Sequence, residues 1–589
     1  MPKSSTVLID HHPGRNSQAI GIARELGTDP ELIHAPSVGV IGNKGDSQCY
    51  IGVQQKVEAI HECLLARIGK GAGQMAVRLV QPEYTVATSD GIRNGTREMR
   101  YSLIGREVTH DSVCEHLSAS GLAGTIAVVA CDKPPVGTLA ALLEHNEPAI
   151  IMSDGSIHPG KDPDSNQTLD IVSAYQVAGH EDPEYRHKIA CAACPGIGSC
   201  GGMFTYNTMQ TFIGVVGMQP LHMVAPVKPS DIVGRDSIRN AVIVAMAVGG
   251  STNVVLHAPE IARAAGFKDF WREIMTPQEF NHLSQHVVPV LTDARPYGLY
   301  SMVDIDLAGG VQVIVKELMD AGMLNGDVPT CTGETLAEQV ARLGTKSADG
   351  VVVYPVEKPY KPTGGLRLLG GNLSPDYSAI LKLAGVEGGL EGNVFRGSAR
   401  VFEGEAGLLE ALDKTPEVFQ NHDMVIVRYE GPSGAPGMPE MLDSTSRITT
   451  LCREKNIVVG LMTDARFSGG SVGLVIGHVG PEAALGGPIA LIENGDEITA
   501  DLNNNELNCT ALNDPAVFKA RMAAWRKVVE ANGGIHPNCG DTDTRLLNRM
   551  RRSGVSALQG GGMHPDREIW VSEPRAAEKS GFEPRNKWH

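Results

Sequence analysis

The chain has 589 residues, of which 42% are hydrophobic and 20% are charged, and its formal net charge at pH 7 is −17. A chain of this length is too long for one hydrophobic core, so we expect at least two domains. The acidic balance argues against a general nucleic-acid-binding protein, because such a protein presents a basic face.

Neither a secretion signal nor a membrane span is visible in the sequence. Residues 1–24 lack the apolar core of a signal peptide. The longest apolar run, 241–248, is far too short to cross a bilayer. We therefore expect a cytoplasmic protein with no membrane partner. The cysteines number 11, an odd count, and in a reducing compartment they favour free thiols and metal ligands over disulfides.

Strand and helix patterns alternate through the first half of the chain. Short runs rich in β-branched residues predict strands, and apolar residues spaced three and four apart predict helices. In chain order the predicted strands are 37–42, 84–87, 126–130 and 149–152, and the predicted helices are 54–68, 106–119, 138–144 and 239–248. This alternation predicts a layered α/β domain built on a parallel sheet.

The pattern changes after residues 276–345, which we predict to be mostly helical. Residues 358–371 are rich in proline and glycine, and we interpret them as a linker. Short strands and turns follow, which predict a β-barrel-like domain or a sandwich. The predicted strands are 424–429, 457–462, 475–479, 489–492 and 497–502, and one helix is predicted at 518–532. We place the two domains at 1–365 and 366–589.

One predicted strand ends in three consecutive reactive residues. The apolar run 126–130 leads directly into Cys131, Asp132 and Lys133. Open α/β sheets bind ligands at the carboxyl ends of their strands. Thiolate prefers iron or another soft metal and carboxylate prefers magnesium or manganese, so the tripeptide could serve two metal centres. The alternative is a core cysteine followed by a surface Asp–Lys pair, since free cysteines are commonly buried.

Further thiols and carboxylates follow strand ends or glycine-rich loops. Three protein thiolates on an iron–sulfur cluster leave one iron position open, where it can act as a Lewis acid on a hydroxyl. Oxygen ligands suit magnesium. The candidate thiols are Cys49, Cys131 and Cys200, and the candidate carboxylates are Asp90, Asp132 and Glu440. These residues lie too far apart to form a local motif, so their spacing alone establishes neither site.

Two other features have competing interpretations. Cys191 and Cys194 form a Cys-x-x-Cys pair, typical of zinc or redox sites, but no second pair completes it. Glu440 lies in a Pro/Gly loop, and Ser468 precedes two glycines after the next predicted strand. This serine could act as a base only if a nearby metal stabilised its alkoxide. Each loop, taken alone, is also consistent with an ordinary turn.

Several motifs occur together in a fixed order over nearly the whole chain. They are Ser89-Asp90-Gly91, Cys131-Asp132-Lys133, residues 198–209 around Cys200, and residues 249–253, 370–376, 428–431, 437–441 and 463–470. As a set they resemble the motifs of the dihydroxy-acid dehydratase and phosphogluconate dehydratase family. Their combination is far more specific than any one of them.

The resemblance implies an N-terminal α/β domain that carries an iron–sulfur cluster and a C-terminal β-barrel-like, swivelling domain. The implied cluster ligands are Cys49, Cys131 and Cys200. The implied Mg²⁺ ligands are Asp90, Asp132, Glu440 and a carbamylated Lys133, and the implied catalytic residues are Ser468, as the base, and Lys133. The Gly-Gly-Met sequence after Cys200 is similar to that of members with a 2Fe–2S rather than a 4Fe–4S cluster.

The implied activity is that of a hydro-lyase that converts a 2,3-dihydroxy carboxylate into a 2-keto-3-deoxy acid. The substrate would be a branched dihydroxy acid of amino-acid biosynthesis, or alternatively a sugar acid such as gluconate or a pentonate, or a small acid such as glycerate. A zinc or redox protein built on Cys191 and Cys194 is a competing hypothesis. A non-catalytic sugar-acid binder is another, but a binder needs no base. The resemblance also implies a homodimer or a homotetramer.

The N-terminal third departs from the family pattern. Where the family usually has proline before the first cysteine, this chain has Gln48. The family's Asn and His after that cysteine are replaced by Tyr50-Ile51-Gly52, and Val136-Gly137 stands in place of Pro-Gly. If these positions line the pocket, they affect substrate preference.

Overall fold

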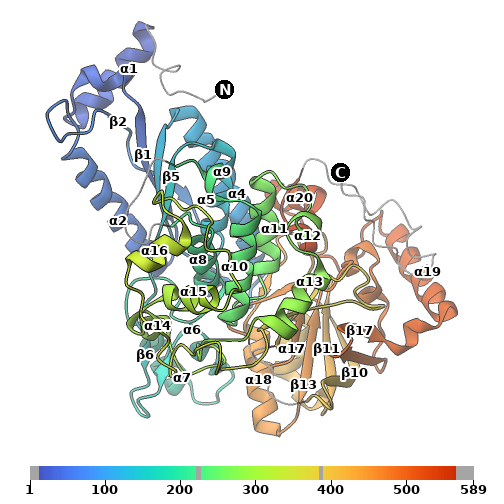
Figure 1. Ribbon diagram of the computed structural model, residues 1–589. Helices are drawn as coiled ribbons and strands as arrows, with labels where there is room; N and C mark the ends of the chain where they lie inside the picture. The colour runs from blue at the N-terminus through green and yellow to red at the C-terminus, as the bar shows by residue number, and fades with distance from the viewer. Residues whose placement is uncertain (1–11, 220–226, 384–388, 472, 565–589) are drawn as a thin grey trace.

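The computed structural model describes residues 12–219, 227–383, 389–471 and 473–564. Within these ranges the chain forms an α/β part built on a parallel sheet and a second part built on a barrel-like sheet (Figure 1). No helix in the described ranges is long and apolar enough to cross a membrane.

The first sheet is parallel throughout, as the sequence pattern predicted. β1 pairs with β4 on one side and with β2 and β3 on the other, and β5 lies beyond β4. Its strands are β1 (Ser37–Lys44), β2 (Arg78–Leu79), β3 (Glu83–Val86), β4 (Gly124–Val129) and β5 (Ala149–Ser153). The carboxyl ends of these strands therefore lie at one edge of the sheet.

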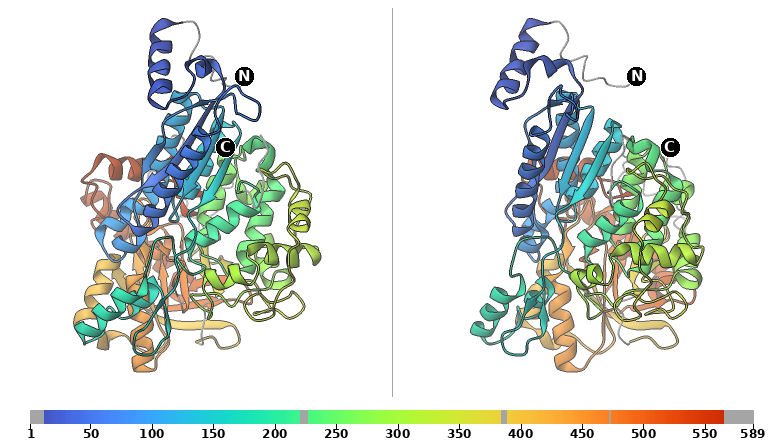
Figure 2. Two further views of the ribbon diagram at one scale, coloured as in Figure 1. Left: turned by 90° about the vertical axis from the view of Figure 1, so that its left-hand side faces the viewer. Right: turned by 60° about the vertical axis from the view of Figure 1, so that its left-hand side comes forward.

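Helices cover both faces of this sheet. Val128 packs in a cluster with Val53 of α2 (Gln48–Leu65). Val129, which points the other way, packs in the larger core shared by α4 (Tyr101–Ser120) and α5 (Pro134–His145). Figure 2 shows α2 running along one side of the blue strands. A strand buried on both faces needs no polar side, which explains the continuous apolar run 126–130.

Besides α2, α4 and α5, the first part has a series of further helices, of which α8, α10 and α11 pack on one another next to α5. They are α1 (Pro13–Glu25), α3 (Asp90–Arg93), α6 (Ile171–Gln176), α7 (Pro183–Ala193), α8 (Thr205–Val215), α9 (Pro229–Ile232), α10 (Arg235–Ala247), α11 (Val254–Ala264), α12 (Phe270–Glu273), α13 (Pro277–His282), α14 (Met302–Leu307), α15 (Val311–Asp320) and α16 (Leu336–Arg342). The last four lie within residues 276–345 but, even with the π-helix Leu283–Val287, cover just under half of that span, so the mostly helical character predicted there is only partly confirmed.

The second sheet curls into a nearly closed barrel, as predicted. In spatial order its strands within the described residues are β17 (Glu506–Cys509), β16 (Glu497–Asp501), β10 (Val394–Glu403), β11 (Asp423–Arg428), β13 (Val459–Thr463), β15 (Val475–Gly477), β9 (Ala379–Lys382) and β8 (Leu366–Leu369). Gly370, directly after β8, pairs with Glu506 of β17, so the two edges meet. The N–H of Leu507 donates to the Gly370 carbonyl at 2.7 Å.

Alternate residues of the barrel strands face inward and outward. Met424 and Ile426 of β11 lie in the barrel core, whereas Val425 and Val427 lie beneath α17 (Gly404–Lys414) and α18 (Asp443–Lys455). Two further helices complete this part, namely α19 (Pro515–Ala531) on the barrel and α20 (Arg545–Ser553), which returns to α4. Both sides of β11 are thus buried, which explains the continuous apolar run of its sequence.

Two predictions about this region were wrong. Residues 489–492, predicted as a strand, belong mostly to the 3₁₀-helix η8 (Pro488–Leu491), because Pro488 favours a first helical turn. The supposed linker 358–371 contains β8, whose residues are all buried: Leu369 lies in the barrel core, and Leu366 and Leu368 lie in the core of the first part. The domain boundary at residue 365 remains a prediction.

Candidate active site

Four parallel strands lead polar side chains to one edge of the first sheet. β1, β3, β4 and β5 are followed by Cys49, Asp90, Cys131 and Asp154. A cavity of about 240 Å³ lies at this edge. The predicted site residues that line it are Cys49, Asp90, Cys131, Asp132, Cys200, Glu440 and Ser468. Residues from both parts of the chain therefore meet in one cavity.

Cys49 and Asp90 lie at helix N-termini rather than in the predicted loops. Helix α2 begins at Gln48, earlier than predicted, because the Ser47 hydroxyl accepts a hydrogen bond from the N–H of Cys49 at 3.4 Å. Asp90 is the first residue of α3. A helix N-terminus favours negative charge, so both positions suit an ionised side chain.

Cys131 has a backbone conformation that is uncommon for a residue other than glycine. Its φ is 60°, in the left-handed region. The Cys131 N–H donates to Ser199 Oγ at 3.4 Å, and Ser199 forms a β-bridge with Ser156. Such backbone costs about 1–3 kcal/mol and persists where the surroundings fix it. The turn thus connects Cys131 to the segment that carries Cys200.

The three candidate thiols have different acidities. Hydrogen bonds from Cys131 and from Ser47, whose Oγ lies 2.8 Å from Cys49 Sγ, lower the pKa of Cys49. The pKa of Cys131 is raised, because Cys49 is its hydrogen-bond partner and the thiol is buried. Burial and the nearby negative charge of Cys49 raise the pKa of Cys200 as well. Cys49 is therefore the thiol of this set that ionises most readily.

Lys133 is buried among the three candidate carboxylates. Its ammonium lies 2.6 Å from Asp90 Oδ2 and 3.8 Å from Glu440 Oε2, and it forms an ion pair with Asp132. The Lys133 side chain is only 2% exposed. Carboxylates from three separate segments thus converge on one cationic position.

Glu440 reaches this position from the second part of the chain. The short strands β12 (Glu440–Met441) and β14 (Arg466–Phe467) pair in parallel, with Glu440 opposite Arg466. Arg466 is fully buried, forms an ion pair with Glu440 and donates from Nε to the Met438 carbonyl at 2.8 Å. Asn253 Nδ2 donates to Glu440 Oε2 at 2.9 Å. These contacts hold the carboxylate where the two parts meet.

Neighbouring charges separate the acidities of Asp90 and Asp132. Burial acts to raise the pKa of Asp90, but the positive charges of Lys133 and Arg466 outweigh it and lower the pKa to about 2. Burial and the charge of Asp90 raise the pKa of Asp132 to about 7. The surrounding charges thus favour the ionised form of Asp90, whereas burial and the charge of Asp90 disfavour ionisation of Asp132.

Ser468 lines the same cavity at the end of β14. Its Oγ accepts a hydrogen bond from the N–H of Gly470 at 3.2 Å, and its N–H donates to the Met441 carbonyl at 3.3 Å. Gly469 permits the chain to pass close to the first part, since an added Cβ would lie 2.6 Å from the backbone nitrogen of Thr205. The hydroxyl is thus held at the cavity wall by backbone contacts.

Family models match both parts of the chain. The model described as dihydroxy-acid/6-phosphogluconate dehydratase N-terminal matches residues 47–225 and 220–339, and the corresponding C-terminal model matches residues 351–561. The chain belongs to the dihydroxy-acid/6-phosphogluconate dehydratase family. It is therefore a hydro-lyase.

Individual relatives cover most of the chain. The dihydroxy-acid dehydratase of Mycobacterium tuberculosis is 36% identical over an alignment of 538 residues that covers 85% of this chain and 89% of that protein. The enzyme of Thermosynechococcus vestitus is 37% identical over 535 residues, 85% of this chain and 90% of its own. The chloroplastic enzyme of Arabidopsis thaliana is 37% identical over 541 residues, 86% of this chain and 84% of its own.

The side chains of this dehydratase fit the two cofactors that its motifs imply. Asp90 Oδ1 is buried and has no hydrogen-bond partner among the described residues, and a cation would satisfy it. The Lys133 ammonium already shows that a positive charge is favoured between the carboxylates. The thiols form a separate, softer set on the same cavity, which suits iron. Hard and soft ligands are thus adjacent but distinct.

The Cys-x-x-Cys pair does not form a metal site of its own in this dehydratase. Cys194 lines the cavity, whereas Cys191 is exposed, with its Sγ 3.6 Å from His187 Nε2. Neither cysteine belongs to a group of three metal-ligating side chains within the described ranges. The hypothesis of a zinc or redox protein built on this pair therefore finds no supporting geometry there.

Sequence reasoning missed two residues that hold the carboxylates. Arg466 pairs with Glu440, and Asn253 bonds Glu440 and Thr205. Both lie in motifs that carried the family resemblance, 463–470 and 249–253. An arginine two positions before Ser468 was an available signal, but only the fold reveals that its partner is Glu440.

Proposed function

We propose that this dehydratase removes water from a 2,3-dihydroxy carboxylate and yields a 2-keto-3-deoxy acid. One observation carries the proposal: three thiols, three carboxylates and Ser468 come together at one cavity. Elimination of water from such a substrate needs a base for the C2 proton and an acid for the departing hydroxyl, and both kinds of group are present. The relatives named dihydroxy-acid dehydratase support the substrate class.

In this proposal Cys49, Cys131 and Cys200 would hold a 2Fe–2S cluster, and Asp90, Asp132, Glu440 and a carbamylated Lys133 would hold Mg²⁺. These groups would supply Lewis acidity toward the departing hydroxyl and toward the charge that develops near the substrate carboxylate. Carbamylation would add CO₂ to the neutral amine of Lys133 with loss of a proton. It would replace the ammonium among the carboxylates with further oxygen ligands.

Ser468 would remove the C2 proton. The N–H of Gly470, 3.2 Å from Ser468 Oγ, would stabilise negative charge on that oxygen. The electron pair left at C2 would form the C2–C3 double bond as the C3–O bond breaks. The resulting enol would tautomerise to the 2-keto acid, and the C2 proton and the C3 hydroxyl together account for the water released.

Substrate choice within this class is the finer part of the proposal. Gln48, which stands where the family usually has proline, lines the cavity, as do Ile92 and His158. Because Gln48 places a polar side chain at the cavity wall, sugar acids such as gluconate or a pentonate should be tested together with the branched dihydroxy acids. A sugar-acid dehydratase is therefore the second candidate function.

The decisive experiment measures 2-keto acid formed by the anaerobically purified protein with Mg²⁺. The substrates offered side by side are 2,3-dihydroxyisovalerate, gluconate, a pentonate and glycerate. We expect product from at least one, and the rank of kcat/KM distinguishes the branched dihydroxy acid from the sugar acids. Tight sugar-acid binding without product, in a protein that contains iron and sulfide, would instead indicate the non-catalytic binder.

A further inference from the structure

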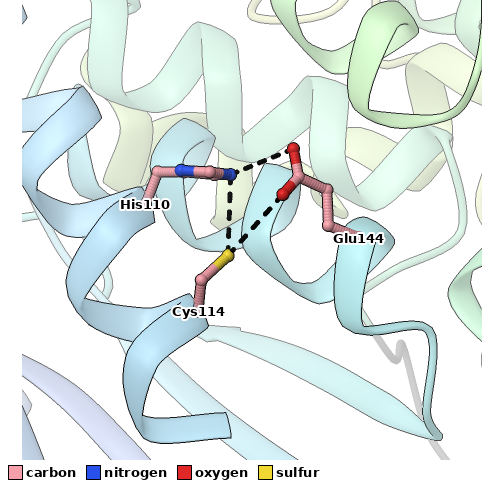
Figure 3. A group of neighbouring side chains, drawn as sticks. All are labelled: His110, Cys114 and Glu144. Atoms are coloured by element: carbon pink, nitrogen blue, oxygen red, sulfur yellow. Dashed lines mark hydrogen bonds and ion pairs between the residues drawn. The ribbon is translucent and has the colours of Figure 1, made fainter. Parts of the chain in front are cut away.

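A second group of metal-ligating side chains lies between two helices of the first part. His110 and Cys114 come from successive turns of α4, and Glu144 comes from the last turn of α5. Figure 3 shows the three side chains pointing toward one another. None of them lines the active-site cavity, and Glu144 lies near the end of α5 opposite to Lys133.

The two helices are held in close contact here. A Cβ on Gly137 of α5 would lie 2.3 Å from the Arg106 carbonyl and 3.2 Å from the His110 nitrogen of α4. This close approach fixes the spacing between the two backbones. The ligand atoms of the cluster are therefore positioned by packed helices rather than by loops, which suits a site of defined geometry.

The distances between the ligand atoms match a tetrahedral metal site. His110 Nε2 lies 3.2 Å from Glu144 Oε1, and Cys114 Sγ lies 3.6 Å from His110 Nε2. Cys114 Sγ lies 3.8 Å from the other carboxylate oxygen, Glu144 Oε2, so a small rotation of the carboxylate would direct one oxygen toward both partners. Ordinary zinc–ligand bond lengths at tetrahedral angles place N and O about 3.3 Å apart, S and N about 3.6 Å apart, and S and O about 3.5 Å apart. Little movement would be needed to enclose an ion.

A second carboxylate orients the histidine. Asp111 Oδ1 lies 3.1 Å from His110 Nδ1, so the other ring nitrogen, Nε2, points to Cys114 and Glu144. Metal-ligating histidines almost always donate their second N–H to a carboxylate, a carbonyl or water in this way. The three ligand side chains are partly exposed or exposed, with Glu144 53% exposed, so an ion has access from solvent.

We propose that His110, Cys114 and Glu144 bind one zinc-like divalent ion, with water in the fourth position. A neutral imidazole, a thiolate and a carboxylate are ligands that zinc prefers, and the two negative charges balance the ion. Binding requires Cys114 as the thiolate and His110 with Nε2 unprotonated, so uptake of the ion releases the Cys114 thiol proton. The ion links α4 to α5 and takes no part in the dehydration.

A second histidine–cysteine pair in the chain provides a matched control. His187 and Cys191 are also four residues apart on a helix, α7, and their ligand atoms are also 3.6 Å apart. Within the described residues, however, this pair has no carboxylate that completes a group of three. If the third ligand decides binding, only the cluster on α4 and α5 retains zinc.

The test compares zinc retention by full-length proteins with intact thiols and excess Mg²⁺. Wild type, Cys114→Ser, Glu144→Gln and the control Cys191→Ser are each equilibrated with Zn²⁺ under anaerobic conditions, passed through a desalting column and analysed for zinc. We expect wild type and Cys191→Ser to hold one zinc more per chain than the other two. Asp111→Asn should retain the site but weaken zinc affinity about 10- to 100-fold.

A Co²⁺ difference spectrum tests the same site without relying on the measured zinc content. Wild type should show thiolate-to-cobalt charge-transfer absorption that Cys114→Ser lacks. Equal zinc contents and equal cobalt spectra in wild type and Cys114→Ser would overturn the proposal. Loss of zinc from Cys191→Ser to the same extent would also overturn it, since the binding would then be a general property of exposed thiols. If Cys114→Ser is poorly folded, Glu144→Gln tests the same site without removing the thiol.

Discussion

Ser468 is the side chain on which the proposed proton transfer depends. Replacement of Ser468 by alanine removes the base and one hydrogen bond from Gly470, but no other side-chain contact that the structure describes. Because a positioned acid or base contributes about 10²–10⁴-fold to a rate, we expect kcat of Ser468→Ala to fall by that factor. Steady-state kinetics with the preferred substrate measures the loss.

Ser471 provides the control for this substitution. Its hydroxyl lies 3.2 Å from Thr445 Oγ1 and 3.4 Å from the Met441 carbonyl, in the same loop but directed into the fold. Ser471→Ala should therefore retain nearly full kcat, with at most a small loss of stability. Near-normal turnover by Ser468→Ala would show that another group removes the proton.

Lys382 is a buried cation without an acidic partner among the described contacts. Its Nζ donates to the Gly469 carbonyl at 2.6 Å, and burial lowers its pKa from 10.5 to about 7. Between these values the unfolded chain binds a proton that the folded chain does not, so the free energy of unfolding rises with pH across this window and falls as pH drops toward 7. The contribution should be on the order of 3 kcal/mol between pH 6 and pH 9.

The variant Lys382→Met should lack this pH dependence. Its unfolding free energy, measured by urea denaturation, should exceed that of wild type most at pH 6, and the difference should shrink toward pH 9. Parallel curves for the two proteins over this range would mean that Lys382 keeps its proton in the folded state. Loss of the hydrogen bond to Gly469 costs about 1 kcal/mol at every pH, so it does not change how the unfolding free energy depends on pH.

At the scale of elements, the contact between α4 and α5 determines where Lys133 lies. α5 begins directly after Lys133, and Gly137, in its first turn, leaves no room for a side chain against the Arg106 carbonyl. We expect Gly137→Ala to destabilise the fold by about 1–3 kcal/mol, because the helices must separate. It should also lower kcat, since Lys133 moves relative to Asp90 and Glu440.

Gly407 is the matched control for this prediction. It lies within α17, and an added Cβ would meet nothing within 4 Å. Gly407→Ala should be neutral or stabilise the protein by about 0.5–1 kcal/mol, because alanine loses less backbone entropy than glycine. If thermal unfolding shifted equally in both variants, the helix contact would not be the cause.

The elements that local patterns predict well are those with a clear period or a continuous apolar run. β4 and β11 were predicted because each contains a short apolar run, and both strands are buried on both faces. η8 was mistaken for a strand because a short apolar run fits either structure. Pro488 favours a first helical turn, and the residues after it form a 3₁₀-helix. β8 was assigned to a linker because proline and glycine surround it, whereas its burial depends on packing against distant segments in two cores.

The candidate site was predictable to the extent that strand ends deliver residues to one edge. Cys131 and Asp132 follow β4 directly, and the family motifs supplied Glu440 and Ser468. The arrangement around Glu440 could not be predicted, because Asn253 and Arg466 are 187 and 26 residues from it in sequence. Likewise, no local pattern shows that Gly137 lets α4 and α5 approach, or that Glu144 meets His110. Long-range packing sets these contacts.

At the scale of the whole molecule, the active site exists only where the two parts of the chain meet. The first part supplies the thiols, two of them after β1 and β4 and the third from the loop before α8, while β12 and β14 supply Glu440 and Arg466. The last described α-helix, α20, contributes to this junction, because it contacts α4 and its Arg551 donates to the carbonyls of Ser433 and Gly434 at 3.0 Å, in the loop before Glu440. Stability of the junction and integrity of the site should therefore change together.

Leu547 of α20 tests this coupling. Its side chain is fully buried in a cluster with Leu103 and Ile104 of α4, Leu256 of α11 and Met438, which lies two residues before Glu440. Leu547→Ala leaves a cavity in this cluster and should lower the free energy of unfolding by about 2–5 kcal/mol. Because the cluster joins both parts, we expect a single calorimetric transition that moves to lower temperature as a whole, with a parallel loss of activity at that temperature.

Arg545, exposed on the same helix, provides the control, and Arg545→Ala should change stability by no more than about 0.5 kcal/mol. A split transition in Leu547→Ala, with one component unmoved, would show that the two parts unfold independently and that α20 stabilises only one of them. A single transition at lower temperature, with activity lost at that same temperature, would instead mean that the two parts unfold together. The stability of the active-site cavity would then depend on the contacts that α20 makes. In that case substitutions far from the thiols and carboxylates could inactivate the enzyme by loosening this junction.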